Sequence, residues 1–270
     1  MRRTIFLFPL LLVACGGGSI DGDRLGEVDG GISLDGGTDT GSSSGLDAPT
    51  GDGTGTGDTG NKCDKTLTGI LRDFKDDHPD FEKELGDDPG IVEKSLGPDG
   101  KPVYAGGTAT PRTTHGKVPF DQWYRDTPGV NVASSFPITM TPGAGGVFTF
   151  SSNAFFPLDG KGFGNQGRDH NFHFTYELRT TFLYKGGETF KFTGDDDLFT
   201  FINGKLVIDL GGVHGAQDGE VNLDARATEL GIEKGKVYPL DFFFAERHTS
   251  ESNFRIDTTL NFVDCGTGIK

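Results

Sequence analysis

Three consecutive carboxylates, Asp195, Asp196 and Asp197, stand directly before the apolar segment at 198–202. Like charges in a row repel one another unless water, a basic partner or a cation offsets them. Carboxylate oxygens are suitable ligands for Ca²⁺, which takes about six to eight oxygens. The alternative is a solvated turn whose aspartates accept hydrogen bonds from the local backbone. The residues alone favour the turn and leave a calcium site open.

Enzymatic chemistry has less support in the sequence. A glycosidase needs two carboxyls held about 5 to 9.5 Å apart across a cleft, and the sequence places no pair at that separation. His170 and His173 are three positions apart on an expected strand, so they are expected to face opposite sides. This spacing does not predict a zinc site, and no nucleophile with a matching base is found. We therefore expect a binding protein and not an enzyme.

The net charge restricts the class of partner. The chain has 270 residues and a formal net charge of −15. Nucleic-acid binding requires lysines and arginines clustered on one face, so we expect no nucleic-acid partner. The content of 33% hydrophobic and 11% aromatic residues is sufficient for a folded core. An acidic folded domain is better suited to divalent cations and neutral ligands.

The N-terminal segment predicts export. Arg2 and Arg3 precede an apolar run at 5–13, which is too short to cross a bilayer as a helix. A basic start followed by a short apolar run is typical of a secretory signal.

The residues that follow this run resemble a lipidation signal. Residues 12–15, Leu-Val-Ala-Cys, resemble the lipobox of bacterial lipoproteins. The resemblance implies a signal peptide at 1–14, lipidation of Cys15, and attachment to a membrane through the acyl chains only. Gly16, where an aspartate would imply retention at the inner membrane, implies the outer membrane or cell surface. An ordinary signal peptide with a chance cysteine is the alternative.

Two cysteines remain after lipidation. Cys63 and Cys265 are expected to form a disulfide, because an exported chain meets an oxidising compartment. Two free thiols are the alternative. Residues 15–60 are rich in Gly, Asp, Ser and Thr, which predicts a disordered tether behind the lipidated cysteine. The folded domain is expected at 61–270.

The pattern of the folded domain is mostly that of β-structure. At its start, Leu67, Ile70, Leu71 and Phe74 are spaced like one face of a helix, which predicts one short N-terminal helix. The rest contains short aromatic and β-branched runs separated by Gly, Asn, Asp and Pro, and we expect strands within 147–158, 170–184, 188–194, 198–212, 238–246 and 253–263.

The strands are expected to pair antiparallel. Helical patterns between them, which a parallel sheet would need, are missing. Asn203-Gly204 separates two apolar runs and predicts a two-residue hairpin, because both residues tolerate the positive φ of a type I′ turn. The sequence therefore predicts an antiparallel β-sandwich or a partly open barrel, with the three aspartates in the loop before the hairpin.

Three segments resemble the fibro-slime domain family. They are PFDQWYRDTPGVN at 119–131, GDDDLFTFINGKLVIDLGGVHGAQ at 194–217 and LDFFFAERHTSESNFRIDTTL at 240–260. This family resembles the β-sandwich domain of the anthrax protective antigen, which also forms the sugar-binding heads of yeast flocculins. The resemblance implies a jelly-roll-like antiparallel sandwich of the protective-antigen type.

The resemblance also implies a site. In lectin-type members, two adjacent aspartates joined by a cis peptide bind calcium, which holds the hydroxyls of a glycan. The corresponding pair is Asp195 and Asp196, and a second loop offers oxygens from Glu246 and Asn253. The further candidates for ligand contact are Arg247, His248 and His214. For Arg247, an ion pair with a nearby carboxylate of the protein is the simpler role.

Two functions from different classes follow. The first is a surface-anchored lipoprotein whose domain binds an extracellular glycan or polysaccharide with the help of Ca²⁺ and mediates adhesion. The second is a structural domain of a cell-surface or matrix assembly that binds protein and no sugar. Trp123 and Tyr124 could stack on a sugar ring, but large aromatic residues are more often part of a core.

Overall fold

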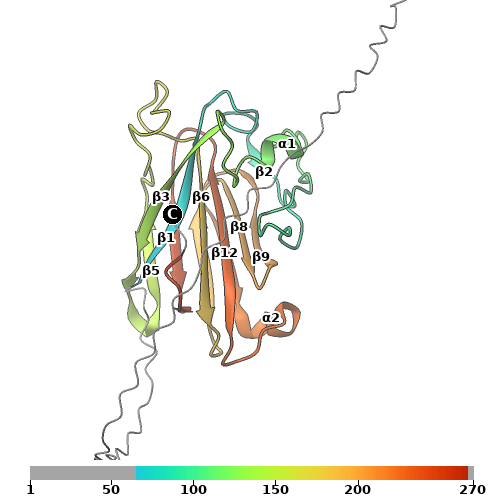
Figure 1. Ribbon diagram of the computed structural model, residues 1–270, viewed down its shortest axis with the longest axis vertical. Helices are drawn as coiled ribbons and strands as arrows, with labels where there is room; N and C mark the ends of the chain where they lie inside the picture. Colours follow the sequence, from blue (N-terminus) through green and yellow to red (C-terminus); the bar gives the residue numbers. More distant parts are fainter. Residues whose placement is uncertain (1–64, 267–270) are drawn as a thin grey trace, which may run out of the picture. The chain divides into compact units, whose positions relative to one another are not determined.

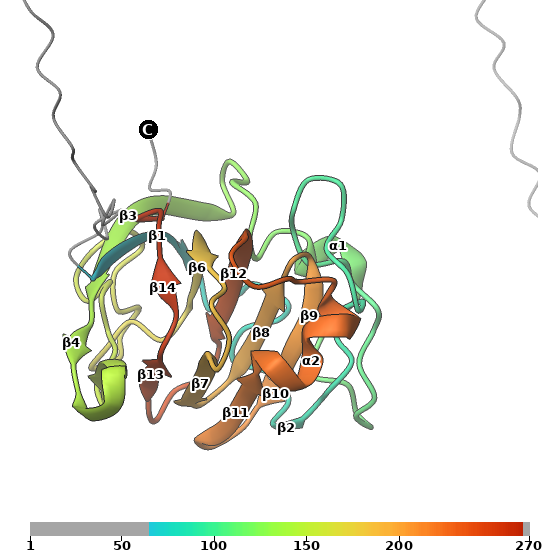
Figure 2. The same ribbon diagram turned by 90° about the horizontal axis from the view of Figure 1, so that it is seen from below.

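Two antiparallel β-sheets face each other in the computed structural model, which describes residues 65–266 (Figure 1). Seen from below, the two sheets form separate layers, with the short helix α2 at their lower end (Figure 2). The antiparallel sandwich expected from the sequence is confirmed. Within residues 65–266, no helix is both long and apolar enough to cross a bilayer.

The large sheet has the strand order β3-β1-β6-β12-β8-β9, and β14 also pairs with β6. Its strands are β1 (Thr66–Phe74), β3 (Asn131–Thr139), β6 (Phe174–Leu183), β8 (Asp197–Ile202), β9 (Lys205–Leu210), β12 (Val237–Glu246) and β14 (Asn261–Phe262).

The small sheet has the order β11-β7-β13-β5-β4, and β10 pairs separately with β2. These strands are β2 (Gly86–Asp87), β4 (Thr141–Pro142), β5 (Phe148–Ser152), β7 (Thr189–Gly194), β10 (Gly212–Val213), β11 (Gln217–Asn222) and β13 (Phe254–Thr258). Short helical segments are α1 (Lys117–Phe120), the 3₁₀ turn η1 (Ala144–Gly146) and α2 (Leu223–Leu230).

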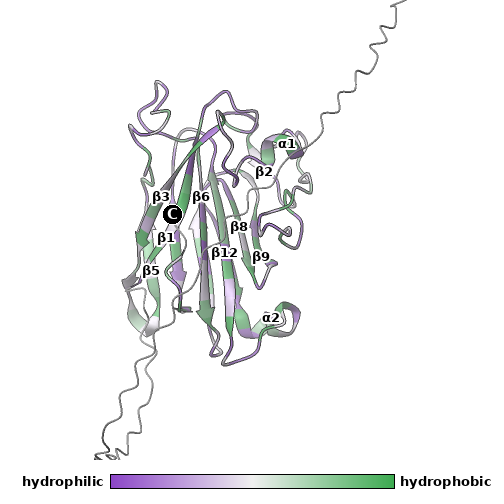
Figure 3. Cartoon of the chain, in the orientation of Figure 1, coloured by the Kyte–Doolittle hydropathy of each residue, from purple (hydrophilic) through white to green (hydrophobic). Residues whose placement is uncertain are grey.

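Phenylalanines fill the space between the two sheets. Phe254 of the small sheet lies with its ring centre 5.2 Å from that of Phe244 on β12 and 5.3 Å from that of Phe192 on β7. Phe155, from the loop after β5, stacks on Phe254 at 4.4 Å. Figure 3 shows hydrophobic segments along strands of the large sheet such as β6 and β12. Successive side chains of a strand point to opposite faces of a sheet, so alternate residues such as Phe242 and Phe244 of β12 face this core.

A second apolar cluster covers the outer face of the large sheet. Phe199 and Phe201 of β8 and Phe243 of β12 pack there against Trp123 and Tyr124, which follow α1. Trp123 and Tyr124 are 0% and 1% exposed, so neither can stack on a ligand, and their role in packing is confirmed. Because both of its faces are covered, β8 is buried along its whole length.

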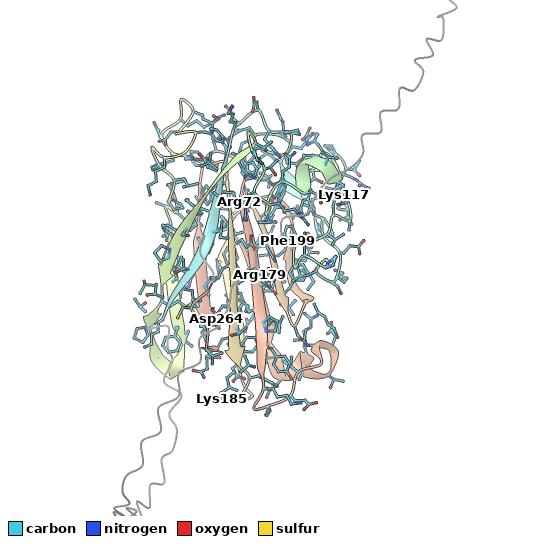
Figure 4. The ribbon with its side chains drawn as sticks, in the orientation of Figure 1. Arg72, Lys117, Arg179, Lys185, Phe199 and Asp264 are labelled. Carbon is cyan, nitrogen blue, oxygen red and sulfur yellow. The ribbon has the colours of Figure 1, made fainter. Side chains whose placement is uncertain are left out.

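Ion pairs occupy the rest of this outer face, where Figure 4 labels Arg72, whose pair is buried, and Arg179, whose side chain is partly exposed. Arg72 donates to Glu177 at 2.8 Å, and Arg179 donates to Asp241 at 2.7 Å. Lys101, from the loop that precedes α1, also contacts Glu177. The Lys101 contact with Glu177 fixes that loop against the sheet.

The N-terminal helix expected at Leu67–Phe74 is wrong. This segment is strand β1, which pairs with β3 on one side and with β6 on the other. Leu67 and Leu71 point into the core, and Gly69 between them lies against the Tyr176 ring. The spacing of the apolar residues suits a helix and a strand alike, and pairing with two neighbouring strands selects the strand.

The hairpin at Asn203-Gly204 is confirmed. The two residues have φ values of 50° and 72°, and Ile202 pairs with Lys205. The Asn203 side-chain nitrogen donates to the Leu230 carbonyl at the end of α2, at 2.8 Å. The hairpin therefore lies at the α2 end of the sandwich, and the opposite end of β8 carries the aspartates.

Candidate functional site

The three aspartates lie where strand β8 begins and strand β12 ends. Asp197 pairs with Ala245 in the large sheet, so Glu246 and the loop at 247–253 start directly beside the aspartates. The turn between β10 and β11 approaches from another side, and the His214 carbonyl accepts from the Asp196 amide at 3.2 Å. Backbone pairing therefore brings together segments that are about 20 to 50 positions apart.

Asp197 holds a buried arginine. Its Oδ2 accepts from Arg247 Nε at 2.5 Å, and its Oδ1 accepts from the Gly212 amide at 2.7 Å. Arg247 also donates to the carbonyls of Asp80 and Thr113. Because the Arg247 side chain is 1% exposed, it supports the site from beneath and does not reach a ligand.

Asp195 and Asp196 tie the 247–253 loop to the start of β8. The two carboxylate oxygens of Asp195 accept from the backbone and the side-chain nitrogens of Asn253, at 2.6 and 3.0 Å. One oxygen of Asp196 accepts from the backbone amides of Arg247 and His248, at 2.8 and 3.1 Å. Asn253 therefore pairs with Asp195, and the aspartates are the acceptors that order this loop.

The cis peptide implied between Asp195 and Asp196 is not observed. The cis bond among residues 65–266 joins Thr110 and Pro111. Asp196 instead has a positive φ of 52°, a conformation that Asp adopts more readily than bulky residues do. The left-handed backbone at Asp196 turns its carboxylate toward the amides of the 247–253 loop.

Buried carboxyl groups are crowded around Asp196. Glu246 is fully buried, and neither of its carboxylate oxygens makes a hydrogen bond of ordinary geometry to the described residues. Burial raises the pKa of Asp196 to about 7, with the Arg247 charge acting in the opposite direction. Burial and the charges of Asp196 and Asp195 raise the pKa of Glu246 well above its ordinary value. Arg247 alone does not neutralise these carboxylates.

The chemistry of these side chains fits a hard cation. Asp195, Asp196 and Glu246 offer only oxygen donors, which Ca²⁺ prefers. The unpartnered oxygens of buried Glu246 are those that a cation would stabilise. In the described part of the chain, however, no three His, Cys, Asp or Glu side chains are grouped as a metal centre. A calcium ion here would need further oxygens from backbone or ligand.

A hollow of about 340 Å³ opens above the aspartates, and we call it the acidic hollow. Of the candidates from the sequence, Asp195, Asp196, His214 and His248 line it, whereas Asn253, Glu246 and Arg247 do not. The Nε2 atom of His214 has no hydrogen-bond partner among the described residues. The hollow thus offers carboxylates and imidazoles to a small polar ligand.

The sequence analysis missed Leu85 in this site. Leu85 lines the acidic hollow and is 64% exposed, although it lies about 110 positions before the aspartates. A single exposed leucine in a polar segment carries no recognisable signal, because isolated apolar residues are common on protein surfaces. Ser250 and Glu251, which also line the hollow, belong to the second loop that the family resemblance had indicated.

Sequence comparison identifies the domain that holds this site. The model of the PA14 domain matches residues 161–269, which include the aspartates, Glu246 and the 247–253 loop. Residues 161–269 of this chain are similar to PA14 domains. This match confirms the expected resemblance to the protective-antigen type of domain.

This chain is also homologous to long proteins of Dictyostelium discoideum. Protein psiR is 40% identical over 202 residues, which cover 68% of this chain and 20% of psiR. Protein psiD is 42% identical over 201 residues, which cover 68% of this chain and 39% of psiD. This chain therefore spans only about a fifth to two fifths of these relatives.

Two solved PA14 domains are similar to this chain. The PA14 domain of the MpAFP antifreeze protein has 12% identity and a TM-score of 0.28, and covers 46% of this chain and 74% of its own. The PA14 sugar-binding domain of an RTX adhesin has 14% identity and a TM-score of 0.28, and covers 46% of this chain and 75% of its own.

Residues before the PA14 match complete the site. Trp123 packs beneath the Arg247 guanidinium, which lies 4.8 Å from the centre of the Trp123 ring. The carboxylate of Asp80 accepts from the Trp123 indole nitrogen at 3.0 Å, and the Asp80 backbone carbonyl accepts from Arg247. The segment from β1 to Trp123 therefore lies under the site, and Leu85 forms part of its rim.

Cys265 is disulfide-bonded. Its expected partner Cys63, the lipidation candidate Cys15, the signal peptide at 1–14 and the tether at 15–60 all lie outside the described residues. The pairing, the lipid anchor and these boundaries stay predictions.

Proposed function

We propose that this chain binds an extracellular glycan or polysaccharide in the acidic hollow of its PA14 domain and acts as an adhesin, not an enzyme. One observation carries the proposal: Asp195 and Asp196 line an open hollow, while Glu246 next to them is buried without a hydrogen-bond partner among the described residues. Hydroxyl groups of a neutral sugar can donate to carboxylates, and the strong net negative charge of the chain disfavours anionic ligands.

Ca²⁺ is part of this proposal. Asp195, Asp196 and Glu246 would supply oxygen ligands, and the Asn253 side chain would keep Asp195 in place. A bound cation would offset the negative charge that Arg247 leaves unbalanced. Sugar hydroxyls could then contribute the oxygens that the protein does not supply.

The direct test is an array of neutral and acidic glycans probed with the full chain, with calcium and after chelation. Binding that is lost on chelation and restored by calcium supports the proposal. Asp196→Asn should abolish binding, whereas Asp218→Asn, which changes an exposed carboxylate on β11, should not. Absence of any glycan binding in the presence of calcium would favour the alternative of a structural domain that binds protein.

The proposed location is the cell surface. The fibro-slime resemblance, the signal peptide and the lipobox at 12–15 support an exported lipoprotein that is anchored through Cys15. Cys15→Ser should release the protein from the membrane fraction. A variant that remains membrane-bound with its signal uncleaved would argue against lipidation at this position.

A further inference from the structure

A second hollow lies beside the acidic hollow. It measures about 470 Å³ and is lined by the segment at 167–170, by Phe172 and by Thr249 and Ser250. Ser250 lines both hollows, so the 247–253 loop forms a wall between them. A ligand that passes over Ser250 would contact both.

An aromatic ring with one covered face lies in the second hollow. The His170 imidazole stacks on Phe156 with a distance of 3.9 Å between ring centres and an angle of 3° between ring planes. His170 Nδ1 also lies 2.7 Å from an Asp159 carboxylate oxygen. The side chain is nevertheless 42% exposed, with Phe156 against one face of the ring and the Phe172 ring nearly perpendicular to it at 6.0 Å between ring centres. The ring is thus a fixed flat surface open to a ligand.

Polar groups surround this ring. Arg168 donates to an Asp76 carboxylate oxygen at 2.9 Å, and its Nε lies 3.6 Å from Glu82, so its charge is balanced within the protein. The hydroxyls of Thr249 and Ser250 and the remaining guanidinium hydrogens can bond to a ligand. A flat ring beside donors and acceptors matches a sugar, which presents apolar C–H groups on one face and hydroxyls at its edge.

The loop that carries the ring is held in place. The Asn171 side-chain nitrogen donates to Asp73 at 2.8 Å, and the Asn171 amide donates to Asp159 at 2.8 Å. The Phe163 amide also donates to Asp73. A site that is already ordered loses less entropy when a ligand binds.

We propose that the second hollow is a sugar subsite and that the ligand is a neutral oligosaccharide that spans both hollows across Ser250. This inference rests on the proposed glycan-binding function of the acidic hollow. One sugar unit occupies the acidic hollow, and a neighbouring unit stacks on the open face of His170. Specificity for chain length and linkage then comes from the second hollow.

The test uses the full chain with calcium and a matched panel of sugars. The panel contains the methyl glycosides of mannose, galactose, glucose and N-acetylglucosamine, each with its di- and trisaccharides, titrated by calorimetry. The native protein should bind one disaccharide about ten-fold more tightly than its methyl glycoside, as an added aromatic contact allows. His170→Ala should reduce this difference to less than about two-fold and leave binding of the methyl glycoside unchanged.

His170→Phe is the matched control. This variant keeps a flat ring in the same place and should retain most of the preference for the disaccharide. If His170 acted only through its contact with Asp159, His170→Phe would lose the preference as His170→Ala does. Equal affinity for short and long sugars, or equal weakening of both by His170→Ala, would overturn the second subsite and leave the glycan-binding function standing. Failure of every sugar to bind the native protein would instead overturn the proposed function itself, and the subsite with it.

Discussion

Arg247 and Asp197 form an ion pair that is almost completely removed from water. Arg247 Nε lies 2.5 Å from Asp197 Oδ2, and the two side chains are 1% and 0% exposed. Desolvation of both charges is costly, and the contacts of Arg247 with Trp123 and with the carbonyls of Asp80 and Thr113 offset part of that cost. These further contacts of Arg247 join the PA14 match to the segment that precedes it.

Removing one partner of this pair should destabilise the protein strongly. Arg247→Met leaves the Asp197 carboxylate buried without its cation, and the free energy of unfolding should fall by about 3 to 5 kcal/mol. Urea unfolding measures the change. Arg255→Met, which breaks a surface pair with Asp257, is the control and should cost less than about 1 kcal/mol. Equal effects of the two substitutions would contradict the importance of the buried pair.

Calcium should stabilise the metal-stripped protein against heat. A cation that binds the folded site and not the unfolded chain adds RT ln(1 + [L]/Kd), about 2.7 kcal/mol at a hundredfold excess over Kd. Asp195→Ala and Asp196→Ala should abolish the increase in melting temperature. Mg²⁺ should substitute poorly, because it requires a smaller octahedral site. Scanning calorimetry measures all of these effects.

Asp197→Ala should behave differently from those two variants. It should lower the melting temperature even without calcium, because Arg247 loses its carboxylate partner. Asp218→Ala is the surface control and should change neither the melting temperature nor the calcium response. If millimolar calcium leaves the native melting temperature unchanged, the aspartates serve only to order the 247–253 loop.

His173 should contribute stability that is lost as the pH falls below about 6.5, whereas Asp196, whose pKa is raised to about 7, contributes in the opposite direction. Burial lowers the pKa of His173, with Glu82 acting in the opposite direction. The unfolded chain therefore takes up a proton at a higher pH than the folded protein does, so the stabilisation present above the unfolded pKa is lost below it. Burial lowers the pKa of His78 as well, which adds an effect of the same sign.

His173→Gln should therefore remove the His173 contribution and make the slope of the unfolding free energy against pH less positive between pH 7 and pH 5. Urea unfolding of the variant and the native protein across this range gives the two slopes. Identical slopes would mean that His173 does not contribute to the acid sensitivity.

Gly69 should not tolerate a side chain. A Cβ atom there would lie 2.7 Å from the Tyr176 ring and 2.5 Å from the Glu177 carbonyl oxygen, so strands β1 and β6 would have to separate. Gly69→Ala should lower the free energy of unfolding by about 1 to 3 kcal/mol. Gly215→Ala is the matched control, because no atom lies within 4 Å of its added Cβ. Equal stability of the two variants would disprove the close contact between the strands.

The sequence by itself determined the elements whose signals are local. The Asn203-Gly204 hairpin was predictable because a type I′ turn depends on the φ preferences of two adjacent residues. Alternation of apolar and polar residues along 172–177 indicated a strand with one face in a core. The resemblance of 194–217 and 240–260 to a known family also located the aspartates and the second loop of the site.

Only the tertiary structure decided features that depend on partners distant in the chain. Residues 67–74 fit a helix by spacing, and pairing with β3 and β6 made them a strand. Arg247 is buried against Asp197 and Trp123. Leu85 lines the acidic hollow although it lies about 110 positions before the aspartates. The His170 ring is held flat because Phe156 stacks on one of its faces. Burial, ion pairing and stacking depend on residues that only the fold brings together. The periodicity and composition of the sequence therefore do not predict them.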